Sequence, residues 1–190
     1  MRKYISNNKP LAVLGNTHTG KTNLCIYLAR NSGYESMYLL GYPSKIDGFR
    51  NLNDIRDLSK IRDAVVVIDE LDEIVPLTNR RAEGQLKSVL KFTAHRNIKL
   101  IFNTQLSQFI SKTMSAMVSQ WAITEIDIFE LKNGSKPKRI LLDYIRIPEI
   151  VNKHTGMALE VGKFVWYNDK SVPTENGIYR FPFQDVGKDW

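Results

Sequence analysis

One short stretch near the start of the chain restricts the fold more than any other part of the sequence. It reads Gly15-Asn16-Thr17-His18-Thr19-Gly20-Lys21-Thr22, the pattern G-x-x-x-x-G-K-T, with an apolar run before it and a helix-like segment after it. Its glycines let the backbone curl until successive N–H groups point at phosphate oxygens, and the following helix adds the positive end of its dipole. The context of strand, loop and helix therefore predicts a phosphate-binding P-loop, rather than a chance match on a glycine-rich turn.

The last residues of this loop have distinct expected roles. Lys21 should reach the β- and γ-phosphates of a nucleotide, and the hydroxyl of Thr22 should hold Mg²⁺. His18 occupies a variable position of the motif, and we expect it to contribute backbone only. The sequence thus predicts ATP and Mg²⁺ as ligands.

The composition is that of one globular domain. The 190 residues are 43% apolar and 25% charged, and no apolar run approaches the roughly 20 residues of a transmembrane segment. The N-terminus lacks the apolar core of a signal peptide, and the single cysteine, Cys25, excludes an internal disulfide and fits a reducing, cytoplasmic location. We expect a single domain, 1–190, with a core at 10–131 and a hairpin and tail at 132–190. A net charge of +7 favours a polyanionic partner, nucleic acid before membrane.

Strand and helix patterns alternate along most of the chain. Strands are predicted at 11–14, 34–40, 64–68, 98–103, 121–131, 140–147 and 164–167, and helices at 23–30, 51–62, 80–95 and within 106–120. The tight turn Asn133-Gly134 would join two of these strands as a C-terminal β-hairpin. The alternation predicts an α/β fold with a mainly parallel sheet flanked by helices, whose ligands bind at the carboxyl ends of the strands.

A second nucleotide motif ends the apolar strand at 64–68. Asp69 and Glu70 follow this β-branched run directly. Asp69 would hold Mg²⁺ through its water shell, and Glu70 would act as the general base that deprotonates the attacking water. The plain alternative is that both acids begin a solvated loop. The pair favours hydrolysis of the nucleotide over phosphate transfer by a kinase, because small-molecule kinases generally lack the second acid.

Polar residues also end the next strand, at Asn103-Thr104-Gln105. An amide there can hydrogen-bond the γ-phosphate or the attacking water, and we assign this role to Gln105. Taken alone, Gln105 would be read as a turn residue.

These motifs, in this order, resemble the FtsK–HerA superfamily of DNA-pumping ATPases. The resemblance covers residues 10–130, and its discriminating part is an arginine before a strand that ends in Thr-Gln, here Ala94–Gln105, followed by a segment like 111–120. The small size and the early P-loop resemble viral genome-packaging ATPases of poxviruses and icosahedral archaeal viruses. The pair His95-Arg96 also resembles the ATPase domain of Zot-like proteins of filamentous phages. The resemblance implies a RecA-like P-loop NTPase fold.

The resemblance also implies partners and a shared site. Members of the superfamily form homo-oligomeric rings, usually hexamers, and use an arginine from the neighbouring subunit at each ATP site. By position, Arg96 is the expected arginine finger, with Arg80 and Arg81 as the other options; a surface arginine that caps the preceding helix is the plain alternative. The implied partners are double-stranded DNA and a viral capsid or portal component, in the host cytoplasm or the virion.

A basic turn offers a candidate contact with DNA. Lys132, Lys136, Lys138 and Arg139 surround the predicted hairpin tip, with no acid among them. Such a tip suits sequence-independent contact with phosphates, although a solvated turn that keeps a sheet edge soluble has the same composition. Together with these features, the resemblance implies an ATP-driven translocase of double-stranded DNA, most simply a viral packaging motor. A Zot-like extrusion ATPase and a P-loop kinase are the alternatives.

Overall fold

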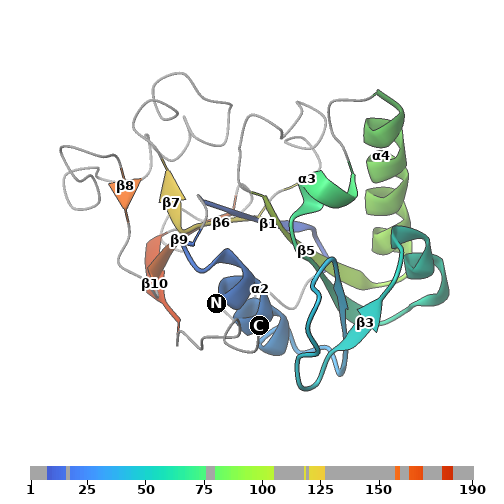
Figure 1. The fold of residues 1–190 in the computed structure, drawn as a ribbon, viewed down its shortest axis with the longest axis horizontal. Coiled ribbons are helices and arrows are strands. Elements are labelled where there is room, and N and C mark those ends of the chain that lie inside the picture. The colour runs from blue at the N-terminus through green and yellow to red at the C-terminus, as the bar shows by residue number, and fades with distance from the viewer. Residues whose placement is uncertain are drawn as a thin grey trace.

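An eight-stranded sheet forms the centre of the molecule (Figure 1). The computed structural model describes residues 8–15, 18–75, 80–104, 118, 120–126, 157–158, 163–168 and 177–181. The elements are β1 (Leu11–Leu14), α2 (Lys21–Arg30), β2 (Ser36–Leu40), β3 (Arg50–Leu52), the 3₁₀ helix η1 (Ile55–Lys60), β4 (Ala64–Ile68), α3 (Leu71–Ile74), α4 (Arg80–His95), β5 (Ile98–Thr104), β6 (Gln120–Ile123), β7 (Glu125–Ile126), β8 (Met157–Ala158), β9 (Lys163–Asn168) and β10 (Gly177–Arg180). Strands β7 and β8 form a separate small sheet.

The main sheet is parallel over most of its width. Its order is β10-β9-β6-β1-β5-β4-β2-β3, and the pairs from β6 to β3 are all parallel, whereas β9 and β10 are antiparallel additions. The run Ala64–Ile68 is buried at every position, as expected for a central strand covered on both faces. The parallel sheet and its order confirm the predicted α/β architecture.

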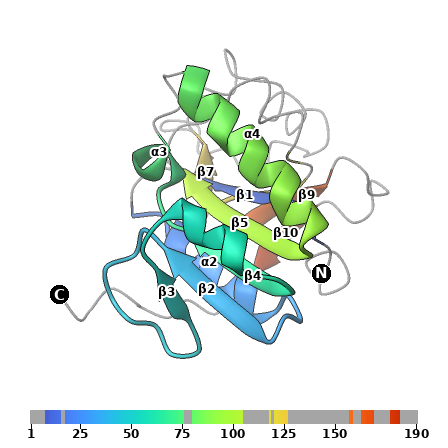
Figure 2. The ribbon, with the colours of Figure 1, turned by 90° about the vertical axis from the view of Figure 1, so that its right-hand side faces the viewer.

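Helices cover both faces of the sheet (Figures 1 and 2). Alternate residues of each strand point to opposite faces. Val13 and Ile101 pack with the residues of α2 on one face, whereas Leu14 and Phe102 pack with those of α3, α4 and η1 on the other. Phe181, which follows β10, packs on the α2 face with its ring centroid 6.0 Å from that of Tyr27.

The helix predicted over 51–62 is wrong in type and extent. Residues Arg50–Leu52 instead extend the sheet as β3, pairing in parallel with β2, and only Ile55–Lys60 is helical, as a 3₁₀ helix. The apolar residues there do have near-helical spacing. However, the edge of β2 offers backbone hydrogen bonds to a strand, and these are more stabilising than those of a short isolated helix.

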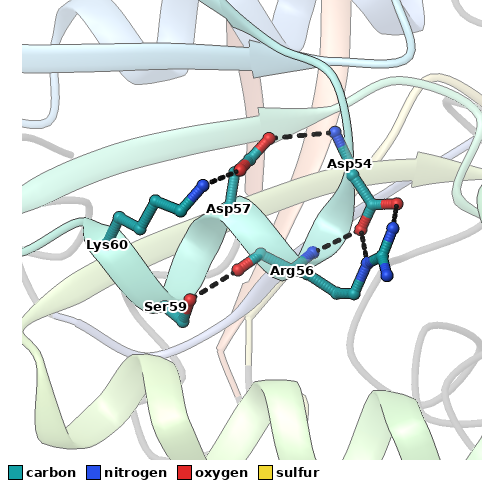
Figure 3. Close-up of polar contacts among 5 residues, drawn as sticks. All are labelled: Asp54, Arg56, Asp57, Ser59 and Lys60. Carbon is teal, nitrogen blue, oxygen red and sulfur yellow. Dashed lines mark hydrogen bonds and ion pairs between the residues drawn. The ribbon is translucent and has the colours of Figure 1, made fainter.

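The 3₁₀ helix begins at a reciprocal cap (Figure 3). The Asp54 carboxylate accepts a hydrogen bond from the Arg56 backbone N–H at 2.7 Å, and the Asp57 carboxylate accepts one from the Asp54 N–H at 3.3 Å. Ion pairs Arg56–Asp54 and Lys60–Asp57 add to it, and the hydrogen bond from Arg56 lowers the pKa of Asp54 to about 2. These contacts explain why helix begins only after Asp54.

Several predicted elements extend beyond what the structure describes. The strand expected at 121–131 is seen to residue 126, and it divides at Thr124 into β6, between β1 and β9, and β7, which pairs with β8. The expected partner strand at 140–147, its Asn133-Gly134 turn, and most of the region 106–120 lie outside the described residues. No helix in the described ranges is long and apolar enough to cross a membrane.

One lysine lies in the core at the amino edge of the sheet. The side chain of Lys99, the second residue of β5, is 0% exposed. Its ammonium donates hydrogen bonds to the carbonyl oxygen of Lys9, at 2.7 Å, and to the amide oxygen of Gln120. Lys99 therefore ties β5 to β6 beneath the start of β1, the strand that leads to the P-loop.

Candidate nucleotide site

The P-loop sequence lies where the motif requires it. Strand β1 ends at Leu14, and α2 begins at Lys21. His18 and Gly20 both have positive φ, 61° and 80°, so the chain curls sharply as it enters the helix. Gly20 needs its lack of a side chain for this conformation, and its carbonyl accepts the first helical hydrogen bond from the N–H of Leu24 at 2.9 Å. Asn16 and Thr17 lie outside the described residues.

Lys21 lies buried against the acidic side chains of the site. Only 7% of it is exposed, and burial lowers the pKa of Lys21 from its ordinary value, while Glu70 and, to a smaller extent, Cys25 and Asp69 oppose that shift. A buried ammonium near the helix N-terminus is well placed to meet the phosphates of a nucleotide. Binding of phosphate would supply negative charge and raise this pKa again.

The P-loop is anchored to the neighbouring strand through Thr124. Its hydroxyl lies 2.7 Å from that of Thr19 and donates to the carbonyl oxygen of Leu14 at 3.1 Å, while its backbone N–H donates to the same oxygen at 2.9 Å. Sequence reasoning missed Thr124, which lay inside a predicted strand with no motif to mark it.

The predicted metal residues meet at the carboxyl edge of the sheet. The Thr22 hydroxyl donates to Asp69 Oδ1 at 2.8 Å, and the Asn103 side-chain N–H donates to the same oxygen. Burial raises the pKa of Asp69, although the hydrogen bonds from Thr22 and Asn103 oppose it. The carboxylate therefore lacks a full positive counter-charge, which a bound cation would supply.

Mg²⁺ fits the donors that gather here. Thr22 and Asp69 provide hard oxygen ligands, the kind that Mg²⁺ takes in small number while keeping water and phosphate oxygens. Nearby, Asp72 Oδ1 is buried and has no hydrogen-bond partner among the described residues, and Asp72 lies close enough to raise the pKa of Lys21 slightly. An unpaired buried carboxylate oxygen beside the P-loop is consistent with a site that binds ions and water.

Glu70 directly follows Asp69 in the chain and has a constrained backbone conformation. Its backbone is left-handed, with φ 49° and ψ 64°, and its N–H donates to the Asn103 side-chain oxygen at 2.7 Å. Glu70 is also the N-cap residue of α3, and its carbonyl accepts from the N–H of Glu73 at 2.9 Å. Its negative charge raises the pKa of Glu73. A left-handed non-glycine residue at the end of a buried strand is typical of functional sites.

Gly41 permits the close approach of the segment that carries Asp69. It has φ +84°, and a Cβ added there would lie 2.6 Å from the Asp69 carbonyl oxygen and 2.7 Å from Ile74 Cδ1. The Asp69 N–H donates to the neighbouring Leu40 carbonyl at 2.9 Å. From the sequence, Gly41 indicated only the end of a strand.

Arg96 lies on the opposite edge of the sheet. It follows α4 and precedes β5, so the whole strand separates it from Asn103, roughly 20 Å at the usual rise per residue. Its guanidinium stacks on the Phe92 ring, 4.5 Å from the centroid, and its carbonyl accepts from the Asp63 N–H at 3.1 Å. Arg96 therefore cannot reach the P-loop of its own chain.

The other predicted site residues lie outside the described part of the chain. These are Gln105, the basic tip residues Lys132, Lys136, Lys138 and Arg139, and the side chains of Arg80 and Arg81. The described residues contain no group of three or more His, Cys, Asp or Glu side chains that could hold a metal ion.

Comparison with solved structures identifies the fold. The genome-packaging NTPase B204 of Sulfolobus turreted icosahedral virus 2, in complex with ATPγS, matches with a TM-score of 0.63 at 14% identity over 92% of this chain and 97% of B204. The chain has the P-loop NTPase fold. The fold agrees with the P-loop NTPase fold that the sequence predicts.

Two larger proteins share this fold. The pCW3 conjugation coupling protein TcpA, with ATPγS, matches with a TM-score of 0.59 at 12% identity over 93% of this chain. The type VII secretion ATPase EccC of Thermomonospora curvata matches with a TM-score of 0.58 at 12% identity over 96% of this chain. The chain spans 60% of the TcpA chain and 24% of the EccC chain. No family model matches the sequence, and no curated protein matches it significantly.

Proposed function

We propose that this chain hydrolyses ATP and uses the energy to move double-stranded DNA as one subunit of a ring, and that the ring packages a viral genome. The fold match to B204 supports the proposal, because B204 is described as the DNA-packaging ATPase of a virus and this chain covers nearly all of it. TcpA, a conjugation coupling protein, shares the same fold. The basic net charge of +7 suits a DNA partner.

One observation carries the proposal. The described groups that would bind and hydrolyse ATP gather at the carboxyl edge of the sheet, whereas Arg96 lies at the other edge, about one strand length away. If Arg96 stabilises the transition state, it must therefore come from a second copy of the chain. In a ring, the amino edge of one subunit would face the P-loop edge of the next.

Each residue then has one step. Lys21 binds the β- and γ-phosphates. Thr22 and Asp69 would hold Mg²⁺, which would supply further positive charge to the phosphates. Glu70 accepts the proton of the attacking water, which Gln105 helps to orient. Arg96 of the adjacent copy stabilises charge on the transferring phosphate, an effect of about 10³–10⁵ in rate in related chemistry. Release of phosphate relaxes the interface and shifts the loops that contact DNA.

A complementation assay tests the shared site. Lys21→Ala removes the phosphate ligand and Arg96→Ala removes the finger, so each variant alone should be inactive, while Arg96→Ala should still bind ATP. Mixed rings contain interfaces at which an Arg96→Ala subunit binds ATP and a Lys21→Ala subunit supplies Arg96. Mixing should therefore restore ATP turnover to about a quarter of the wild-type level for random assembly. Wild-type turnover by Arg96→Ala alone would exclude the assignment.

DNA and concentration separate the alternatives. A ring motor should show turnover that rises cooperatively with protein concentration and increases with double-stranded DNA. A P-loop kinase would leave ATP largely intact until an acceptor is added. A Zot-like extrusion ATPase would hydrolyse ATP without a response to DNA.

The basic tip has its own test. Replacing Lys132, Lys136, Lys138 and Arg139 by glutamine should lower the slope of DNA affinity against salt concentration, because fewer counterions are released on binding. An unchanged slope would remove the tip from the DNA-binding surface and leave the ATPase proposal intact.

A further inference from the structure

The side chain of Asn103 contacts three groups of the site at once. Its oxygen accepts from the Glu70 backbone N–H at 2.7 Å, and its nitrogen donates to Asp69 Oδ1 and lies 3.4 Å from Thr22 Oγ1. Asn103 is 0% exposed, near the carboxyl end of β5. One amide thus links the P-loop helix, the end of β4 and the start of α3.

We propose that Asn103 is a positioning residue for catalysis: its amide fixes the backbone of Glu70, and so aims the catalytic carboxylate, while its other end is held by the pair Thr22–Asp69. The inference rests on the proposed hydrolysis of ATP. It assigns to Asn103 a role distinct from that of Gln105, two residues later, which would contact the water itself.

The orientation of the amide is determined by its partners. The Glu70 N–H can be satisfied only by an acceptor, and the Asp69 carboxylate only by a donor. A flipped amide would place its N–H₂ against an N–H and its oxygen against a carboxylate, so both contacts would become repulsive. Asn103 can therefore hold Glu70 in one arrangement only.

Glu70 needs such support because of its backbone. A left-handed conformation, with φ 49°, is unfavourable for a residue with a Cβ and persists where surrounding contacts determine it. The hydrogen bond from the Glu70 N–H to the Asn103 side-chain oxygen is one of the contacts that stabilise this conformation. Without it, Glu70 could return to a commoner conformation and its carboxylate would point elsewhere.

The side-chain nitrogen of Asn103 connects Glu70 to the predicted metal ligands. Asp69 Oδ1 accepts from both Thr22 and Asn103. A change at Thr22 and Asp69 when Mg²⁺ and ATP bind would be felt directly by the Asn103 amide, and through it by Glu70. Asn103 is thus placed to couple the position of the base to the nucleotide side of the site.

The variants separate the two ends of the amide. Asn103→Ala removes both contacts and should lower kcat about 100-fold, as a misaimed catalytic group does, with ATP affinity changed less than about threefold. Asn103→Asp keeps an acceptor for the Glu70 N–H but turns a carboxylate oxygen toward Asp69, so it should hold the Glu70 backbone without restoring kcat. Ile101→Val, on the same face of β5, controls for a mild packing defect and should turn over ATP normally.

A double-mutant cycle identifies the path of the effect. If Asn103 acts through Glu70, then Asn103→Ala should cost less than about threefold in a Glu70→Gln background, where the base is already absent. A purely structural defect would instead cost the same factor in both backgrounds. Additive effects, or normal turnover by Asn103→Ala, would overturn the inference.

Hydrogen exchange tests the contact without relying on turnover. The Glu70 amide should exchange slowly in the wild-type protein, faster in Asn103→Ala, and slowly again in Asn103→Asp. Equal exchange in all three would refute the positioning role. A wild-type protein that binds ATP but never hydrolyses it would refute the proposed function, and the exchange result would still decide whether Asn103 holds Glu70.

Discussion

The buried ammonium of Lys99 should make the stability of this protein depend on pH in a way that one substitution abolishes. Burial, together with the charge of Lys9, lowers the pKa of Lys99 from 10.5 to about 7. The unfolded chain therefore binds more protons than the folded protein between about pH 7 and pH 10.5. Stability should rise with pH across this window, and the full cost of the charge should be present below it.

The size of the effect follows from the same values. A pKa lowered from 10.5 to about 7 corresponds to about 5 kcal/mol between the two protonation states. Linkage then predicts a gain of about 2 kcal/mol in the free energy of unfolding from pH 7 to pH 9. The hydrogen bonds from the ammonium to Lys9 and Gln120 favour the charged form and reduce this gain, so we expect about 1–2 kcal/mol.

Lys99→Met is the informative variant, because methionine has a similar length and does not titrate. Urea unfolding of both proteins at several pH values between 7 and 9 gives the difference curve, in which the other titrating groups cancel.

Parallel curves for the wild type and Lys99→Met would refute this reasoning. They would mean that Lys99 keeps an ordinary pKa in the folded protein. In that case the two oxygen acceptors would fully compensate the loss of water around the ammonium.

Three further outcomes are expected at the nucleotide site. Gly41→Ala should destabilise the protein by about 2–4 kcal/mol in urea unfolding and reduce ATP turnover, because the new Cβ would lie 2.6 Å from the Asp69 carbonyl oxygen. Wild-type stability of this variant would contradict the close approach of the two segments. Asp69→Asn should abolish Mg²⁺-dependent turnover but raise the melting temperature of the protein without nucleotide. The reason is that the pKa of Asp69 is raised in the folded protein, so the ionised carboxylate destabilises the fold increasingly as pH rises above about 4. A lower melting temperature for Asp69→Asn would contradict this reasoning. Thr124→Val should weaken ATP binding about three- to tenfold in a fluorescent-nucleotide titration, because it removes the hydroxyl contact with Thr19. Thr93→Val alters a buried threonine whose hydroxyl donates to the Leu90 carbonyl within α4, and it should leave ATP binding unchanged.

Local patterns in the sequence were enough to predict most of the sheet. The β-branched run at 64–68 and the apolar run before Gly15 form central strands, because such runs are stable only when covered on both faces. The spacing of apolar residues predicted the wrong element at 51–62, where the structure depends on whether a strand pairs with the edge of β2. That edge is formed by residues 38–40, which lie 12 positions earlier in the chain, so the spacing within 51–62 could not decide it.

The grouping of the candidate nucleotide-site residues was predicted in part, for the same reason. Lys21, Thr22, Asp69 and Glu70 were predicted from motifs, and the structure brings them together because parallel strands end at one edge. Asn103 was noticed as a polar residue at a strand end, but its three contacts depend on the register of β5 beside β4. Asparagine at a strand end has no such meaning by itself.

The sequence by itself determined that this chain has a P-loop, followed by two acids at the end of a buried strand. Those features depend on residues close together in the chain, whose chemistry and backbone preferences act locally. Only the tertiary structure decided that Asn103 holds Glu70, and that Arg96 lies across the sheet from the site. Both depend on which strands lie side by side and in which direction they run, and that is decided by packing of the whole sheet.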